Sequence, residues 1–504
     1  MADYDVVVVG AGLGGLACAS RLSRLGHSVG VIDKHAVVGG YASHFTREGF
    51  RFDVSLHGIG SLNEGSEFRA ILEACGVMHR IKPISKAYPY SVYTDRQVQD
   101  IPQDAIAYQN LLCELYPSEV MGIRKLFGAL ERFKMELSFL YAEDIPEWKK
   151  GLLFPIKCPL LLKWSRRTTE QVCKEYISSV DLISFFTVQW PYYGLPPHRL
   201  SALYFFIPWV GYHMDGCYYL QGGGQSLSDG FADSIRESGG SITLKKAVKQ
   251  ILHEGRRVRG VELKDGSFIS ADWVVSNASP SVTMRDLIKV EGISIKVDQY
   301  VAKLGQMEVG TSILQLFLGL DCSPENIGFD QQDLHVWENR DHLQDYRLIQ
   351  SGDYAHANLL FTNYSMLDGA NTPEGKGIMV ITCLDEISNW PDRGIAYKQK
   401  KKDITDLLLN RAERFFPGIR QHVVVAELAT PRTMERYTGN SKGAVYGYAQ
   451  TVKQSGIGRL GSVTPFQNLS LVGAWTRPGG GYQGAIISGF LEANRIHRKI
   501  QARN

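Results

Sequence analysis

The chain begins with an apolar run and then changes to a helical pattern of apolar positions. Residues 4–9 end in four consecutive valines, which favour a strand that is buried on both faces. Between residues 16 and 25 apolar side chains recur at every third position, as on one face of a helix. A second short apolar run occupies residues 28–32. The opening therefore predicts a strand, a glycine-rich turn, a helix and a second strand.

Two further groups of short apolar runs follow. Residues 241–278 alternate around a turn at 264–266, which favours a part of the chain rich in hairpins. A later group predicts a separate sheet, and the chain ends in a strand followed by a helix. The predicted strands span residues 242–244, 248–252, 258–263, 273–275, 312–318, 335–337, 358–362, 378–382 and 468–475, and the last helix spans residues 484–499.

The composition is that of a globular protein with a large core. Hydrophobic residues make up 44% of the 504 positions, and Lys and Arg exceed Asp and Glu by only 55 − 52 = 3. This balance excludes a disordered chain and gives no basic surface for nucleic acid, so we expect no nucleic-acid partner. The eight cysteines form no C-x-x-C pair, so neither a disulfide framework nor a metal site is expected.

The start of the chain and its apolar runs bear on location. The first three residues lead at once into the first strand, without the basic region and cleavage site of a signal peptide. No run reaches the roughly 18 apolar residues of a membrane-spanning helix. We expect a cytoplasmic protein, or one that associates with a membrane peripherally.

A glycine motif occupies the turn after the first strand. In Gly10-x-Gly12-x-x-Gly15, the first glycine makes a tight turn, the second lets the backbone approach a pyrophosphate, and the third lets the helix lie close to the strand. Asp33, at the end of the second strand, is placed to accept hydrogen bonds from a ribose. A second match at residues 479–484 lacks these flanking elements. The first motif therefore predicts a dinucleotide site.

The segments that follow carry a family resemblance. Residues 37–42 supply a second glycine pair, and residues 49–60 contain Phe-Asp-Val-Ser-Leu-His-Gly-Ile-Gly. With the opening motif they resemble the amine-oxidase-like flavoproteins that include phytoene desaturases, carotenoid isomerases and retinol saturases. Residues 52–60 look most like the last two groups, which usually have glycine where this chain has Ser55. The resemblance implies FAD and an α/β fold, with a Rossmann-type FAD-binding domain interleaved with an α+β substrate domain, the cap.

The same resemblance assigns segments and residues. It gives residues 1–75, 225–289 and 441–504 to the FAD-binding domain, and residues 76–224 and 290–440 to the cap. Residues 468–483 match the C-terminal FAD motif of the group, in which a helix start offers N–H donors to the flavin. The implied FAD contacts are Gly10, Gly12, Gly14, Gly15, Asp33, Lys34, Gly39, Gly40, Tyr41, Ala42, Val248, Asn277, Gly473, Ala474, Gly481, Tyr482 and Gln483.

His57 is the one titratable residue that the motif places near the flavin. It is a candidate catalytic residue that donates a proton or holds the flavin ring, and the alternative is a structural histidine.

Aromatic residues concentrate in residues 182–220. Twelve of these 39 positions are aromatic, against 11% in the whole chain. Such residues suit the walls of a pocket for a long apolar molecule, and they suit an ordinary core equally well. The twelve are Phe185, Phe186, Trp190, Tyr192, Tyr193, Tyr204, Phe205, Phe206, Trp209, Tyr212, Tyr218 and Tyr219.

Residues 148–167 mix apolar clusters with Lys and Arg between two tryptophans, Trp148 and Trp164. Pro155 and Pro159 are expected to prevent a continuous helix. The segment fits contact with a bilayer interface, with tryptophan at the headgroups, or a buried turn with a basic rim. We favour membrane contact, because a lipid-soluble substrate has to be collected from a membrane.

These observations lead to three functional hypotheses. The first is an FAD-dependent oxidoreductase or isomerase that desaturates, saturates or isomerises C–C and C=C bonds of a hydrophobic polyene or isoprenoid, with NAD(P)H or a quinone as the external electron partner. The second is a flavin amine or small-molecule oxidase. The third is a non-catalytic lipid-binding protein that keeps FAD as structure. The substrate, the direction of electron flow and the oligomeric state stay open.

Overall fold

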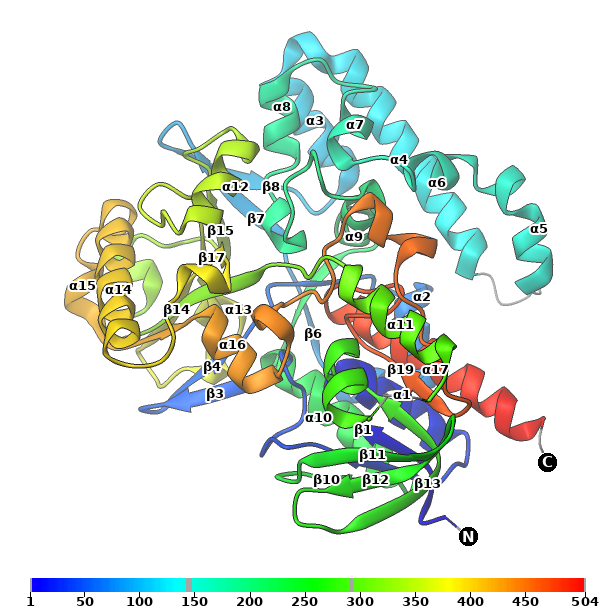
Figure 1. Cartoon of the computed structure of the whole chain (residues 1–504). Helices are drawn as coiled ribbons and strands as arrows, with labels where there is room; N and C mark the ends of the chain where they lie inside the picture. The colour runs from blue at the N-terminus through cyan, green and yellow to red at the C-terminus, as the bar shows by residue number, and fades with distance from the viewer. Residues whose placement is uncertain (1, 142–146, 290–292, 503–504) are drawn as a thin grey trace.

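The computed structural model describes residues 2–141, 147–289 and 293–502. In this part of the chain, two seven-stranded sheets lie at different ends of the molecule, and a group of helices covers the space beside them (Figure 1). A separate three-stranded sheet has the order β5 (Ile59–Gly60), β9 (Cys217–Leu220), β6 (Pro83–Ser85).

The first sheet is built on the opening of the chain. Its order is β10-β2-β1-β13-β12-β11, with β19 beside β13, and its strands confirm the predicted runs at both ends of the chain. The four valines of β1 are buried, as a strand between two parallel neighbours requires. The bounds are β1 Tyr4–Val9, β2 Val29–Ile32, β10 Ser241–Thr243, β11 Val248–Glu254, β12 Arg257–Leu263, β13 Phe268–Ser276 and β19 Leu469–Leu471.

One predicted strand of this sheet needs correction. The strand predicted over residues 468–475 is only three residues long, because the chain leaves the sheet at Val472 for a glycine-rich loop. The predicted hairpins of residues 241–278 are present as the antiparallel pairs β11-β12 and β12-β13. Strand β13 pairs in parallel with β1 and antiparallel with β12, so the hairpins extend the first sheet.

Three helices pack together beside this sheet. Helix α1 (Leu13–Arg24) lies against α17 (Tyr482–Gln501) and α10 (Gly223–Glu237). Gly489 of α17 approaches so closely that a Cβ there would lie 2.1 Å from the carbonyl oxygen of Gly14. The two ends of the chain are therefore packed directly on each other.

The second sheet, which we call the cap sheet, is mostly antiparallel and has the order β18-β14-β17-β16-β15-β7-β8. Every residue of β14 is buried, and α14 (Ile395–Phe415) covers the outer face of the sheet (Figure 1). This confirms the predicted separate sheet. The bounds are β7 Tyr90–Thr94, β8 Gln97–Ile101, β14 Ser312–Leu320, β15 Asp333–Val336, β16 Leu359–Asn363, β17 Gly377–Asp385 and β18 Val423–Ala429.

A hairpin from the N-terminal segment packs on the cap sheet. Strands β3 (His44–Arg47) and β4 (Phe50–Asp53) bring Phe45 and Phe52 against Phe317 of β14, with ring centroids 5.0 and 5.7 Å away. The two large sheets are therefore joined through an aromatic cluster as well as through the chain.

Most of the remaining helices form the upper part of Figure 1 or flank the cap sheet, while α2 and α11 pack on the side of the first sheet. Among the described residues, no helix is long and apolar enough to cross a membrane. The bounds are α2 Glu67–Ala74, α3 Ala105–Leu115, α4 Val120–Tyr141, α5 Glu147–Lys157, α6 Pro159–Trp164, α7 Thr169–Cys173, α8 Val180–Phe186, α9 Ala202–Met214, α11 Ile295–Gln306, α12 His342–Ser351, α13 Tyr364–Leu367, α15 Ile419–His422 and α16 Pro431–Thr438.

The predictions for residues 148–167 were partly wrong. Pro155 lies inside α5, and the helix continues because Gly151, whose carbonyl loses its N–H partner, is exposed to water. The break falls at Cys158, before Pro159. Trp164 is fully buried between the rings of Phe133 and Phe206, both 4.8 Å away, so it is a core residue and not a membrane anchor. The side chain of Trp148 lies outside the described part.

Asp345 of α12 gives a prediction about stability. Its carboxylate is 1% exposed and accepts a hydrogen bond from the backbone N–H of Asn358 at 2.8 Å. Burial raises the pKa of Asp345 to about 7, from 3.8, against the opposing effects of Asn358 and Arg411. The folded protein therefore binds more protons than the unfolded chain between these two values, so this residue's contribution to stability is lost as the pH rises from about 4 to about 7.

Replacing Asp345 by asparagine should remove this dependence, because the amide oxygen still accepts the hydrogen bond. We expect the variant to gain on the order of 2–4 kcal/mol over the wild type near pH 8 and little near pH 4. Urea unfolding at both pH values measures the difference. The matched control is Asp330→Asn, at an exposed acid, and an equal effect of the two substitutions would contradict the assignment.

Candidate functional site

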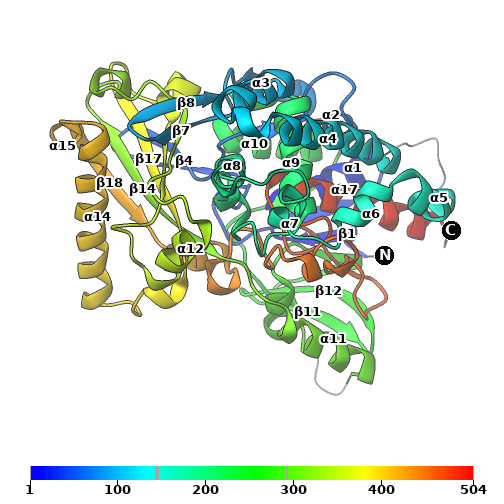
Figure 2. The ribbon, with the colours of Figure 1, turned by 90° about the horizontal axis from the view of Figure 1, so that it is seen from above.

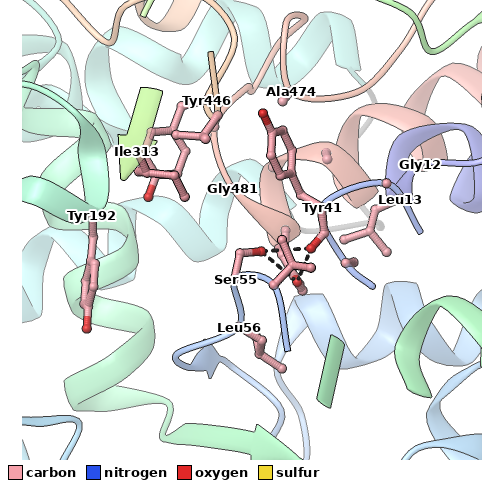
Figure 3. Close-up of a pocket in the computed structure, with 18 of the residues that line it drawn as sticks. Gly12, Leu13, Tyr41, Ser55, Leu56, Tyr192, Ile313, Tyr446, Ala474 and Gly481 are labelled. Atoms are coloured by element: carbon pink, nitrogen blue, oxygen red, sulfur yellow. Dashed lines mark hydrogen bonds between the residues drawn. The ribbon is translucent and has the colours of Figure 1, made fainter. Parts of the chain in front are cut away.

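One large cavity of about 960 Å³ lies between the two sheets and collects most of the predicted site residues. Figure 3 shows two of its walls. Gly12, Leu13, Tyr41 and Ala474 lie on one side, and Tyr192, Ile313 and Tyr446 lie on the other. The first wall comes from the ends of the first sheet, and the second from the cap sheet and the helices beside it.

The N-terminus of α1 faces this cavity. Gly12 is its N-cap, no side chain caps the helix, and its first turn holds no acidic residue. The first backbone N–H groups are thus left for an anionic ligand. A Cβ on Gly12 would lie 2.7 Å from Asn277 Nδ2, and one on Gly14 would lie 2.5 Å from the Cα of Gly473. These glycines therefore make room for Asn277 and for the C-terminal loop.

Gly15 is the exception among the predicted contacts. It is buried behind the cavity wall, and a Cβ there would lie 2.2 Å from the carbonyl oxygen of Gly10. Its role is the close approach of helix and strand, as the motif predicts, and not a contact in the cavity.

Asp33 ends β2 at the rim of the cavity. Its two carboxylate oxygens accept hydrogen bonds from the backbone N–H groups of Ala11, at 2.6 Å, and His35, at 2.8 Å. The acid therefore also holds the glycine turn in place. Other predicted contacts that line this part of the cavity are Gly10, Lys34, Gly39, Gly40, Ala42 and Val248.

A second helix start, that of α17, faces the same cavity. Its N-cap is Gly481, without a side-chain cap and without an acidic residue in the first turn. Gly473, Tyr482 and Gln483 line the cavity beside it, and Gln483 Nε2 donates to the carbonyl of Gly60 at 3.0 Å. Two uncapped helix N-termini, from opposite ends of the chain, thus converge on one space.

Arg459 organises this region and was missed by sequence reasoning. It is 1% exposed, and its guanidinium donates to the carbonyls of Ala474 at 2.6 Å, Tyr446 at 3.0 Å and Tyr448 at 2.7 Å. No motif marks it, because its partners are backbone atoms that only the fold brings together.

Ser55, where the family resemblance leads one to expect glycine, is part of a hydrogen-bond network. Its hydroxyl donates to the carbonyl of Tyr41 at 2.9 Å and lies 3.1 Å from the hydroxyl of Tyr482 (Figure 3). The Tyr482 hydroxyl also donates to the carbonyl of Tyr41, at 3.2 Å. The serine side chain thus links the N-terminal loop to the start of α17.

His57 lies in the cavity wall beside buried charges. Its Nδ1 is 3.1 Å from Asp333 Oδ1, and Lys86 Nζ is 2.5 Å from Asp333 Oδ2. The rings of His57 and Tyr192 are stacked, with centroids 5.4 Å apart. Asp333 and Lys86 were not predicted from the sequence, because they lie 276 and 29 positions from His57 and belong to no motif with it.

The aromatic residues of segment 182–220 contribute both to the cavity wall and to the core, the two alternatives that the sequence left open. Some rings line the cavity and others fill the core behind it. Those that line it are Trp190, Tyr192, Tyr193, Tyr204 and Tyr212, while Phe185, Phe186, Phe205, Phe206, Trp209 and Tyr219 are buried without reaching it. The cap wall is completed by residues that were not predicted as site residues, although most of them lie in the cap sheet; among them are Ile313, Leu360, Thr382, Leu384 and Tyr446.

Several solved structures share the fold at low sequence identity. An oxidoreductase from Methanosarcina mazei gives a TM-score of 0.65 at 18% identity, covering 97% of this chain and 99% of the other. A putrescine oxidase with bound putrescine gives 0.61 at 14% identity, covering 98% of each chain. These likenesses confirm the predicted α/β fold.

Curated relatives match over most of their length. The chloroplastic prolycopene isomerase of Daucus carota is 24% identical, with 98% of this chain and 80% of the relative covered. The all-trans-retinol 13,14-reductase of Danio rerio is 24% identical, with 94% and 82% covered. A family model described as flavin containing amine oxidoreductase matches residues 13–497. Because that match spans nearly the whole chain, this protein belongs to the flavin-containing amine oxidoreductase family and is a flavin-dependent oxidoreductase.

Proposed function

We propose that this protein is an FAD-dependent enzyme that desaturates, saturates or isomerises a long hydrophobic polyene. The observation that carries the proposal is the single cavity that runs from two uncapped helix N-termini to an aromatic and aliphatic cap wall. The end of the cavity at the helix N-termini suits a dinucleotide, and the end at the cap wall suits an apolar chain. Relatives named prolycopene isomerase, retinol reductase and diapophytoene desaturase support this class of substrate.

The residues at the end of the cavity near the helix N-termini fit FAD. The start of α1 would receive the pyrophosphate, Asp33 a ribose and Val248 the adenine, while the start of α17 would face the flavin ring. When bound, the flavin supplies the hydride or electron chemistry. In this proposal residues 1–75, 225–289 and 441–504 hold the cofactor, and residues 76–224 and 290–440 form the cap.

The charges near the cap wall favour a polyene over an amine. An amine substrate is a cation, and a free carboxylate at this wall would favour its binding. Asp333 is already paired with Lys86, and burial raises the pKa of Asp345 to about 7, so this carboxyl is partly neutral near pH 7. An amine would therefore meet little uncompensated negative charge at this wall.

A panel of substrates tests the proposal. The FAD-loaded protein is incubated with carotenoid and retinoid polyenes in vesicles, with primary amines as the competing class, and with NAD(P)H, quinone or oxygen as electron partner. Chromatography detects polyene products, and hydrogen peroxide is measured with the amines. We expect conversion of at least one polyene and no peroxide from amines. Peroxide from amines, with every polyene returned unchanged, would favour the oxidase instead.

Helix α5 is the proposed membrane contact. Leu152 and Ile156, one helical turn apart, are 69% and 73% exposed, and Lys149 and Lys157 are exposed beside them. Helix α5 packs against α4, whose Leu137 lines the cavity (Figure 2). An apolar surface flanked by cations suits the interface of an acidic membrane on the cytoplasmic side. A polyene would then pass a short distance from lipid to cavity.

Replacing both Leu152 and Ile156 by glutamate should weaken binding to acidic vesicles by at least about tenfold, because each buried aliphatic side chain contributes roughly 1.5–3 kcal/mol. Co-sedimentation with phosphatidylglycerol vesicles measures this loss. Flavin content and turnover of detergent-solubilised substrate should not change. The matched control replaces Ile106 and Met121 by glutamate; they are 65% and 67% exposed and lie on α3 and α4. Equal losses of vesicle binding in the two variants would contradict a membrane contact confined to α5.

A further inference from the structure

His57 connects the cavity to a buried polar cluster that the cofactor chemistry leaves unexplained. Asp333, at the start of β15, is fully buried and receives three donors. His57 Nδ1 lies 3.1 Å and Thr362 Oγ1 lies 2.7 Å from Oδ1, and Lys86 Nζ lies 2.5 Å from Oδ2. Lys86 Nζ also donates to the backbone carbonyl of His57 at 3.1 Å. One lysine thus holds both the carboxylate and the backbone that carries the histidine.

The charge state of this cluster follows from its burial. Lys86 is 1% exposed and Asp333 is not exposed, so removing either one would leave an uncompensated buried charge. Burial by itself would raise the pKa of Asp333, but the charge of Lys86 and the hydrogen bond from His57 hold it below its usual range. Asp333 is therefore an ionised acceptor, and His57 Nδ1 must carry a proton to donate to it.

The other ring nitrogen of His57, Nε2, is available to a ligand in the cavity. His57 lines the cavity between Tyr192 and Tyr364, and within the described ranges we find no hydrogen-bond partner for Nε2. The neighbouring His335 does not compete for this role, because burial lowers its pKa to about 3 and keeps it neutral. The hydroxyl of Tyr192 is buried without a partner, and burial raises its pKa well above 10.

We propose that His57 transfers a proton to or from the substrate through Nε2, and that Asp333, Lys86 and Thr362 are positioning residues that keep the Nδ1–H form facing Asp333. The inference rests on the proposed function. It concerns the proton, which the hydride chemistry of the cofactor does not supply.

In saturation, a bound reduced flavin would supply the hydride for one carbon of the double bond. The π electron pair would then form a C–H bond at the other carbon with the proton on His57 Nε2. The ring is left neutral, with Nδ1–H still donated to Asp333, and Nε2 takes its next proton from water. In desaturation the neutral Nε2 accepts a proton from one carbon, and the electron pair of that C–H bond becomes the new π bond, while a bound oxidised flavin would take up the hydride from the neighbouring carbon.

Two readouts test this role. The first is the NMR signature of ¹⁵N-labelled histidine in flavin-free protein, assigned with His57→Gln. We expect the neutral ring to be in the Nδ1–H form in the wild type, and Asp333→Asn to add the Nε2–H form, since an amide also donates. A wild-type ring in the Nε2–H form would overturn the proposal.

The second readout is turnover in heavy water. For a redox reaction, solvent deuterium should enter the saturated product of the wild type at both carbons, because the hydrogen that a reduced flavin would supply also exchanges with water. His57→Gln should lower kcat by about 10²–10⁴-fold with KM, flavin content and reduction by dithionite nearly unchanged. Asp333→Asn should lower kcat less. The matched control is His356→Gln, an exposed histidine paired with Asp353 at 2.9 Å, which should behave as wild type.

The outcomes separate the two claims. A wild type that binds flavin but converts no polyene overturns the proposed function, and the role of His57 falls with it. A wild type that converts polyene while His57→Gln stays within about threefold of it overturns only the role of His57, and leaves the proposed function standing.

Discussion

Replacing Gly12 by valine is expected to give a folded protein that purifies without flavin. Gly12 caps α1 inside the cavity, and any Cβ there would lie 2.7 Å from Asn277 Nδ2. The two methyl groups would also fill the space over the free N–H groups of the helix, where the pyrophosphate would bind. We expect the affinity for FAD to fall by about 100-fold or more, equivalent to ~3 kcal/mol.

The flavin absorbance per mole of purified protein measures this effect, and circular dichroism checks that the variant is folded. The matched control is Gly128→Val in α4, where a Cβ would meet nothing within 4 Å, and its flavin content should equal that of the wild type. A Gly12→Val protein that keeps a full complement of flavin would show that the cofactor does not lie over α1.

Replacing Ile313 by tryptophan should abolish conversion of the polyene while leaving the flavin bound. Ile313 belongs to β14 and lies in the cap wall across the cavity from Tyr41 (Figure 3). The larger ring would occupy the apolar end of the cavity, where a long substrate would have to lie. We expect kcat/KM for the polyene to fall by about 100-fold or more, equivalent to ~3 kcal/mol of transition-state stabilisation.

The conservative variant Ile313→Val is the control for this result. It shortens the side chain by one carbon, keeps the wall apolar and should retain activity within about threefold. Steady-state kinetics and flavin absorbance are measured on all three proteins. If Ile313→Trp loses flavin together with activity, the substrate end and the cofactor end of the cavity are not separate as proposed.

Local sequence patterns were sufficient to predict the first sheet because its signals are short in range. The four valines of β1, the glycine turn and the periodicity of α1 lie within the first 25 residues, and each follows from propensity and burial. The prediction of a separate cap sheet succeeded for the same reason. What failed were the ends of elements, such as β19, where backbone packing of Gly14 against Gly473 ends the strand.

The residues of the candidate site were predictable mainly where they belong to a sequence motif. The predicted contacts other than Gly15 line the cavity, since a glycine-rich turn leaves its mark in adjacent residues. Lys86, Asp333 and Arg459 leave no such mark. They are single polar residues on separate segments, and their importance comes from being buried together or against backbone carbonyls. Trp164 is the opposite case, in which a sequence pattern was misleading. The mixture of apolar and basic residues around it suggested a membrane contact, but its ring is buried in the core.

An anaerobic titration of the FAD-loaded protein, in its oxidised and its reduced form, with polyenes and then with amines shows directly on which class of substrate the flavin acts. Flavin absorbance and product formation are followed together. We expect a polyene to change the flavin spectrum and to be converted, and we expect amines to do neither. Flavin that is bleached by amines, and that polyenes leave unchanged in both redox states, would contradict this expectation.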